Sequence, residues 1–291
     1  MLHTMKIGVC SLFLLPLLAL SAMDSPASKP VLLNKGLPLR SGTLVREKRD
    51  ILVERGRSRQ VSATETSDVS TRYTQRLNLV HKTGGPGMEE LRVADLMCEW
   101  SHFTGPTPPP NEQASPLASK TLRARKTGAR WDYDLSQGKP APEERAGLDQ
   151  LAMAASLLDL LSVCIGQAPR KVGESWKTEI PAPRGKAVGH IVMKDIQCTL
   201  IGVEERPDGA HASITLTGQL SIERPMNLSS HVDIIFEASL TRRLTDMLDV
   251  DTRITGTYTL KGEANIAGKG KSQLTFEYPY TLTRTLKIED R

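Results

Sequence analysis

The last part of the chain alternates between apolar and polar residues, and this alternation constrains the fold more than any other feature. From Leu274 to Ile288 the apolar residues occupy even positions, with Arg284 as the one interruption. The odd positions hold threonine, glutamate, lysine and one proline. Because neighbouring side chains of a strand point to opposite faces of a sheet, this segment has one dry and one wet face. The pattern is typical of antiparallel strands that cover a core on one side.

Apolar residues occupy even positions as far back as Ile196. Short sequences that favour tight turns divide this region into strands. Turns are predicted at 207–209, 224–227, 241–243 and 268–270, most of which contain glycine, proline, aspartate or asparagine. The segments between them predict long strands joined by short hairpins. Long strands with one dry face are expected to curve around whatever they bury.

Residues 142–166 break the β pattern and predict the one clear helix of the chain. Pro142 and the two glutamates after it suit a first turn, because that turn has unpaired N–H groups and a positive dipole end. Asp159 is the one charged residue in the second half of the helix, and Gly166 ends it. A helix this apolar is expected to pack into the sheet. Its uncharged stretch is too short for a bilayer, which needs about 20 residues.

The segment before the helix, residues 37–135, is also predicted to be β. Tyr73, Leu77 and Leu79 alternate with polar neighbours, and the prolines between 103 and 119 predict an exposed loop or linker. Neither β half has an obvious core of its own, so the two halves are expected to share the helix.

The fold class that follows is mainly β. We expect a curved antiparallel sheet, a β-clam or half-barrel, in two halves wrapped on one long helix. The single domain runs over 37–291, with a β half at 37–135, the helix at 142–166 and a β half at 170–291.

Residues 1–22 have the layout of a secretory signal peptide. Lys6 precedes an apolar run, and small residues place cleavage after Ser21 or Ala22. An uncleaved anchor is the alternative. Residues 23–36 are rich in proline, serine and lysine and predict a flexible leader. A secreted or periplasmic location is therefore expected, without an integral membrane span once the signal is removed.

Charge and aromatic content argue against a nucleic-acid partner. The formal net charge is +5, but in the densest basic stretch, 40–59, acidic residues interleave with the arginines. Nucleic-acid binding needs a continuous basic face, and stacking of single strands usually needs more aromatic residues than the 4% found here. A weak contact with an anionic surface stays open.

Cys98, Cys164 and Cys198 remain after signal cleavage, and none belongs to a C-x-x-C pair. The sequence therefore suggests neither a redox motif nor a zinc knuckle. All three are expected to be small buried residues, while one internal disulfide stays open.

No motif for catalysis, a cofactor or a metal is found, so no site residues of these kinds are predicted. Gly268 to Ser272 resembles the end of a phosphate-binding loop, but Asn265 stands where that motif needs glycine and a strand follows. The histidines are expected on the surface, with a metal pair between neighbouring strands as the alternative. They are His81, His102, His190, His211 and His231.

Three tryptophans stand at the ends of proposed strands and are expected to anchor the core or its rim. Lining a ligand site is the alternative. They are Trp100, Trp131 and Trp176.

The stretch from Pro169 to Trp176 reads P-R-K-V-G-E-S-W. It resembles a P-x-K-V-G-[DE]-S-W phrase found in secreted bacterial proteins of unknown function, which carry a signal peptide, a β half, a helix and a second β half. By architecture these proteins are similar to the periplasmic lipoprotein-carrier superfamily, in which a curved sheet wraps helices and cradles lipid. The resemblance implies a lipid cradle, although this chain has one clear helix rather than several.

Three functions are compatible with the sequence. The first is a non-catalytic protein that binds a lipid, another apolar ligand or an envelope partner. The second is a purely structural interaction module of the envelope. The third is a hydrolase whose site is assembled from distant residues.

Overall fold

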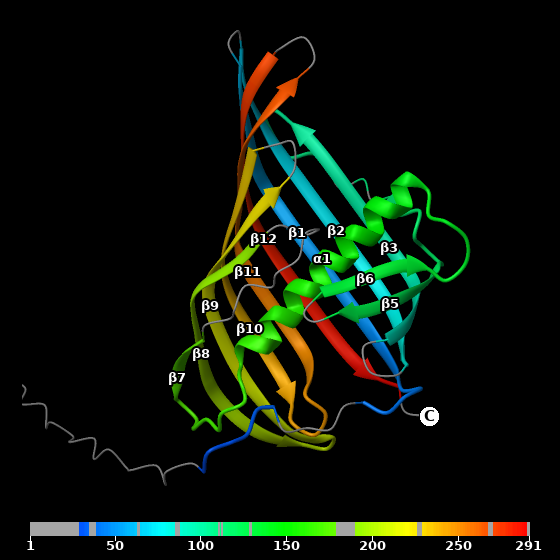
Figure 1. The fold of residues 1–291 in the computed structure, drawn as a ribbon, viewed down its shortest axis with the longest axis vertical. Coiled ribbons are helices and arrows are strands. Elements are labelled where there is room, and N and C mark those ends of the chain that lie inside the picture. The colour runs from blue at the N-terminus through cyan, green and yellow to red at the C-terminus, as the bar shows by residue number, and fades with distance from the viewer. Residues whose placement is uncertain are drawn as a thin grey trace, which may run out of the picture.

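The computed structural model describes residues 29–34, 39–62, 65–84, 88–109, 111, 113–127, 130–178, 190–225, 229–266 and 270–289. The predicted signal peptide at 1–22 lies outside these ranges. Within them the predicted fold class is confirmed, because a curved antiparallel sheet wraps one helix (Figure 1).

Each β half contributes a series of strands to this sheet. The first series is β1 (Leu44–Val61), β2 (Thr66–Thr83), β3 (Met88–Phe103), β4 (Gln113–Ala114), β5 (Thr121–Thr127) and β6 (Arg130–Leu135). The second is β7 (Ser175–Thr178), β8 (His190–Arg206), β9 (Gly209–Pro225), β10 (Ser229–Arg243), β11 (Leu248–Ile266) and β12 (Gly270–Ile288).

All the described strands belong to one 12-stranded sheet in the order β6-β5-β3-β2-β1-β12-β11-β10-β9-β8-β7, with β4 on β3. The long strands β1 and β12 pair antiparallel in the middle, with one irregularity between Leu52 and Arg57, so the seam between the two halves is a paired ladder rather than an open edge (Figure 1). This seam joins segments that lie at opposite ends of the sequence.

The even parity predicted for the second half places one apolar row on the inner face of the sheet, toward the helix. Adjacent strands align this row in register across β8 to β12. Its members are all buried and are Cys198, Leu216, Ala238, Ile254 and Leu282. Ile51 of β1 continues the row beyond the seam, opposite Leu282.

The helix α1 (Pro142–Cys164) begins and ends close to the predicted positions. Glu144 accepts a hydrogen bond of 2.8 Å from the backbone N–H of Ala141, which satisfies a donor at the free end of the first turn. Beyond the last turn, Gly166 has a φ of 72°. This left-handed conformation favours glycine and stops the helix.

Two apolar cores lie between α1 and the sheet, one for each β half. The C-terminal half of α1, with Leu158 and Leu161, packs in the first core against β8 to β12. The N-terminal half, with Leu148 and Leu151, packs in the second core against β2, β3, β5 and β6. The helix crosses the inner face diagonally and connects the halves (Figure 1).

By length and mean hydropathy, α1 is the one helix in the described ranges that could cross a membrane. Its most apolar window is 35% buried inside the protein. The judgement from the sequence that its apolar stretch is too short rested on uncharged residues alone, whereas an 18-residue window of the helix, with Asp159 inside it, has a mean hydropathy of 1.4. In the structure α1 packs on the sheet.

Part of the predicted leader at 23–36 is packed rather than free. Leu33 is fully buried in the first core. The backbones of Val31 and Arg170 exchange hydrogen bonds of 2.7 and 2.8 Å. A run of three apolar residues, Val31 to Leu33, is too short to show a helical or strand period, so the sequence could not reveal this contact.

Arg242 holds the leader, the helix and the sheet together. Its side chain is completely buried and forms a 2.7 Å ion pair with Asp249 on β11. It also donates hydrogen bonds to Asn34 of the leader and to Ser162 of α1. Because a buried charge without partners is costly, these three contacts stabilise one arrangement of the three segments.

The proline-rich segment 103–119 is not simply an exposed loop or linker. Leu117 is fully buried in the second core, where it lies against α1. A Cβ atom at Gly147 of the helix would come within 2.8 Å of the Leu117 side chain, so glycine is what allows this close approach.

We predict that Leu117→Ala lowers the free energy of unfolding by about 2–5 kcal/mol, because it leaves a cavity in the second core. Urea unfolding measures this change. Ile235→Ala is the matched control, since Ile235 is 63% exposed and its truncation should cost less than about 0.5 kcal/mol. Equal losses in the two variants would contradict the assigned role of Leu117.

Candidate functional site

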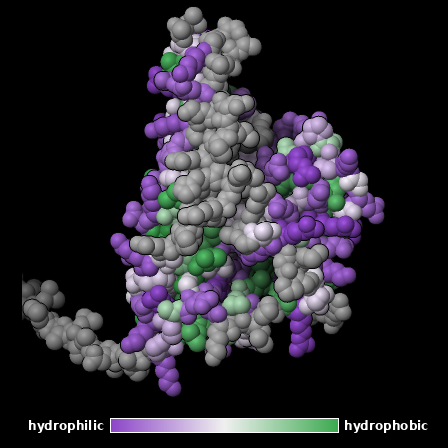
Figure 2. Space-filling view, viewed as in Figure 1, coloured by the Kyte–Doolittle hydropathy of each residue, from purple (hydrophilic) through white to green (hydrophobic). Residues whose placement is uncertain are grey.

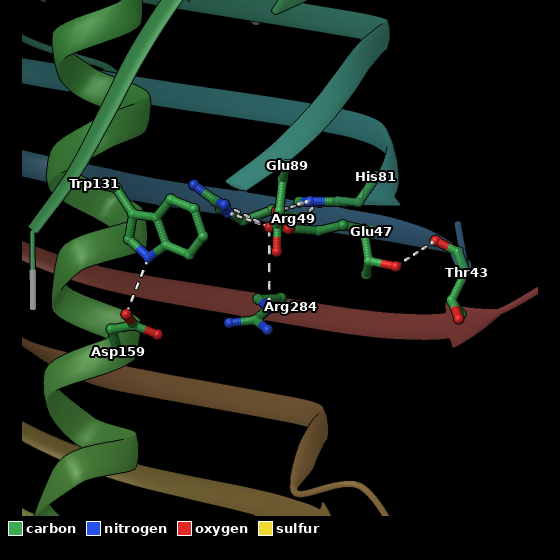
Figure 3. A network of polar contacts seen from close by, with 9 residues as sticks. Thr43, Glu47, Arg49, His81, Glu89, Trp131, Asp159 and Arg284 are labelled. Atoms are coloured by element: carbon green, nitrogen blue, oxygen red, sulfur yellow. Dashed lines mark hydrogen bonds and ion pairs between the residues drawn. The ribbon is translucent and has the colours of Figure 1, made fainter. Parts of the chain in front are cut away.

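A buried network of charged side chains lies at the seam of the sheet, between the two apolar cores. Glu47 and Arg49 come from β1, His81 from β2, Glu89 from β3 and Arg284 from β12 (Figure 3). Inward-facing positions of β1 are odd-numbered here, so Glu47 and Arg49 point toward α1 as Val45 and Val53 do. The network therefore replaces apolar side chains in the middle of the inner face.

Glu47 and Arg49 form the centre of the network. The Nε and Nη2 atoms of Arg49 donate to Glu47 Oε1 at 2.8 and 2.5 Å. Their exposed fractions are 5% for Glu47 and 2% for Arg49. Burial acts to raise the pKa of Glu47, but the Arg49 guanidinium and the His81 ring hold that pKa well below its usual range.

His81 lies between two carboxylates. Its Nε2 atom is 2.8 Å from Glu47 Oε2 and its Nδ1 atom is 3.1 Å from Glu89 Oε2. Both nitrogens therefore face acceptors, which is the arrangement of a doubly protonated ring. Burial opposes the charge on His81, but its hydrogen bonds to Glu47 and Glu89 outweigh burial and raise the pKa to about 9.

The expectation that the histidines lie on the surface is wrong for His81 and His211. His211 is 2% exposed and its Nδ1 atom is 2.9 Å from the carbonyl oxygen of Gly209. His231, in contrast, has a largely exposed side chain and pairs with Asp233. The parity of Leu77 and Leu79, extended by two residues, would have placed His81 on the inner face.

The helix side of the site carries a second polar cluster. Trp131 Nε1 donates a 3.0 Å hydrogen bond to Asp159 of α1, and Lys126 forms an ion pair with the same carboxylate at 2.5 Å (Figure 3). Trp131 packs partly buried against the second core, which fits its predicted anchoring role. Trp176 is also buried, with the Arg170 guanidinium 4.5 Å from its ring centroid. The side chain of Trp100 lies outside the described residues.

The three cysteines are free thiols, and two of them are buried. Cys198 donates a weak hydrogen bond to the backbone oxygen of Cys164 at 3.5 Å. Burial raises the pKa of Cys164 to about 12 and that of Cys198 to about 11, so both stay protonated near neutral pH. Among the described residues, no group of three or more histidine, cysteine or acidic side chains is placed to hold a metal.

A row of half-buried apolar side chains continues along the inner face beyond the charged network. On β11 and β12, Tyr258 stacks on Tyr278 with ring centroids 6.1 Å apart, and Phe276 lies 5.9 Å from Tyr278. Gly56 of β1 makes room for this row, because a Cβ atom there would lie 2.0 Å from the Tyr278 ring. Leu260, opposite Phe276, is also half-buried.

A surface cavity of about 680 Å³ lies at the far end of β1. Arg55, Arg57 and Arg59 line it together with Asp68 and Glu277. Arg59 is 3.7 Å from Asp68, so acids interleave with the bases in space as they do in the sequence. This arrangement is typical of a solvated charged face rather than of a basic binding surface.

Comparisons with known proteins find little that is similar. No protein-family model and no curated protein matches the chain. Among solved structures, a lipovitellin chain studied for its lipid–protein interactions is similar, with a TM-score of 0.46 and 11% identity. The similarity covers 86% of this chain but 25% of the lipovitellin chain.

We predict that the stability of the protein falls between about pH 6.5 and pH 9 because of His81. The folded-state pKa of about 9 lies above the ordinary value of 6.5. The folded protein therefore binds the extra proton in this range, and the stabilisation is complete below pH 6.5 and lost as pH rises through 9. Its full size is about 3 kcal/mol.

Urea unfolding at a series of pH values measures this effect. His81→Gln should flatten the stability profile between pH 6.5 and 9, whereas His231→Gln, which changes an exposed histidine, should leave the wild-type slope. A slope that persists in His81→Gln would show that another group binds the proton.

Proposed function

We propose that this protein is a secreted or periplasmic binding protein, without catalytic activity, that holds a lipid or another apolar ligand on the inner face of its curved sheet. The row of half-buried side chains around Phe276 and Tyr278 carries the proposal. Water-facing surfaces of a soluble protein rarely keep contiguous apolar patches without a ligand or partner for them.

The two faces of β11 and β12 support an inner-face site. The inner positions Leu260, Leu274 and Phe276 are apolar, whereas their neighbours on the outer face are threonine, glutamate and lysine. Apolar residues also gather in the lower middle of the molecule around the C-terminal half of α1 (Figure 2). Val163 of that half is 53% exposed. Apolar surface is thus concentrated where the sheet and the helix meet.

The chemistry of the buried groups supports a role without catalysis. His81, with its raised pKa and two carboxylate partners, holds its proton near neutral pH and is a poor general base. The two buried thiols are protonated and are poor nucleophiles. These groups have the properties of structural or ligand-orienting residues.

A structural role in the cell envelope is the second candidate, and one observation favours it. The part of the inner face beneath the C-terminal half of α1 is filled, because Leu33, Leu161 and Ile254 are buried together in the first core. A filled interior needs no ligand. The two candidates differ in whether the half-buried row above α1 takes up apolar molecules.

Binding of an uncharged probe separates these candidates. Nile red should fluoresce when added to the purified protein, and dodecanol should displace it. Phe276→Ser should weaken both affinities by about tenfold, because part of the buried apolar contact is lost. Thr275→Ser, on the adjacent outward-facing position, is the control and should bind like the wild type.

Native mass spectrometry and lipid extraction on protein taken from its own compartment provide the second measurement. A co-purified apolar molecule supports the binding role. Absence of any such molecule, together with no response to Nile red, would favour the structural role.

A further inference from the structure

Two guanidinium groups at the seam have buried N–H donors that no protein acceptor meets. The Nη1 atom of Arg49 and the Nε atom of Arg284 are both buried without a hydrogen-bond partner. An unpaired buried donor costs about 1–3 kcal/mol relative to a paired one. Two such donors on neighbouring strands therefore indicate that a hydrogen-bond acceptor from outside the chain binds here.

Three of the four carboxylate oxygens of the network are already engaged. Glu47 Oε1 accepts both the Nε and the Nη2 donors of Arg49, and Glu47 Oε2 faces His81. Glu89 faces the other nitrogen of His81. The nearest approach of Arg284 Nε to the network is 4.0 Å, to Glu47 Oε1, which is too long for a hydrogen bond.

The charges of the network do not balance. Arg49, Arg284 and the protonated His81 are three positive groups, and they face two carboxylates. Arg49 and Arg284 also stand directly opposite each other on β1 and β12. Like charges directly opposite each other destabilise a sheet, and the one Glu47 carboxylate beside them balances only one of the two positive charges.

We propose that Arg49 and Arg284 bind the carboxylate head group of an anionic amphiphile. This inference rests on the proposed function and specifies its ligand as a molecule with one negatively charged end. Guanidinium groups suit such a head group, because their planar forks present parallel N–H donors to the two oxygens of a carboxylate.

Apolar side chains continue from the two arginines along the inner face. The next pair of inward-facing residues along the seam is Ile51 and Leu282, followed by Tyr280 and Tyr278 on β12. At about 3.3 Å per residue, Tyr280 lies about 13 Å from Arg284 along the strand, within the length of an extended dodecyl chain. Tyr280 is partly buried and lies next to Tyr278 on the inner face, at the near end of the half-buried row to which the proposed function assigns the apolar ligand.

Arg284 lies on the side from which a ligand would enter the site. Its side chain is partly exposed, whereas that of Arg49 is not. In Figure 3 the guanidinium of Arg284 extends from β12 toward the helix, on the side where Trp131 and Asp159 lie. A head group that enters between the sheet and α1 meets Arg284 first and Arg49 second.

Three ligands with matched chemistry test this site on the full-length purified protein at pH 7.5. Dodecanoate carries the negative head group and the chain, dodecanol carries the chain alone, and acetate carries the head group alone. Displacement of Nile red and a shift in the melting temperature measure binding. We expect dodecanoate to bind at least about tenfold more tightly than dodecanol, since charged hydrogen bonds distinguish the two.

Arg284→Gln removes the partly exposed member of the pair and keeps the Glu47–Arg49 contact intact. We expect it to abolish the preference for dodecanoate while it leaves dodecanol binding unchanged. Arg284→Lys should restore part of the preference, because the positive charge returns. Arg253→Gln is the control, because it removes an exposed positive charge from the outer face of the neighbouring strand β11. This variant should behave like the wild type.

Each of the other results of these binding measurements would contradict a different part of the proposal. Equal affinities for dodecanoate and dodecanol in the wild type would overturn the carboxylate site and leave the proposed function standing. If acetate binds as tightly as dodecanoate, the ligand is a small anion, and the proposal that it is an amphiphile is wrong. If neither dodecanoate nor dodecanol binds, both the inference and the proposed function are wrong.

Discussion

The architecture depends on burial of one apolar helix that neither β half can cover alone. Leu148 and Leu151 of α1 pack into one core, while Leu158 and Leu161 pack into the other. Removal of this surface from water favours both halves on the same helix, and the pairing of β1 with β12 then makes their inner faces continuous. The helix and the seam are thus two parts of one constraint, because loss of either would leave an apolar face uncovered.

The seam is also where the protein places its most costly groups. Glu47, Arg49 and His81 lie among apolar neighbours, at positions where valine or leucine would be expected to stabilise the sheet at least as well. Their mutual contacts oppose the desolvation cost, but the unpaired donors of Arg49 and Arg284 remain. The proposed binding role would account for the concentration of charge at this point, between the two cores.

Several features of the fold could be predicted from local sequence alone. The alternation ending at Ile288 predicted one-sided antiparallel strands, and the apolar residues from Pro142 onward predicted the helix. Other features could not be found in this way. Leu33 ends a run of only three apolar residues and Leu117 stands in a proline-rich segment, and the burial of both depends on distant partners. Arg284 was visible as an interruption of the apolar row, but its neighbours on β1, β2 and β3 were not, so the charged site could not be assembled.

The sequence by itself determined the type of each element, because the two-residue and 3.6-residue periods decide which side chains share a face. It also determined that the inner face of the C-terminal strands is apolar and the outer face polar. Only the tertiary structure decided that β1 pairs with β12 and that the inner face is shared across this seam. The reason is physical: strand pairing and the convergence of Glu47, His81 and Arg284 are contacts between residues far apart in the chain, and no local period encodes them.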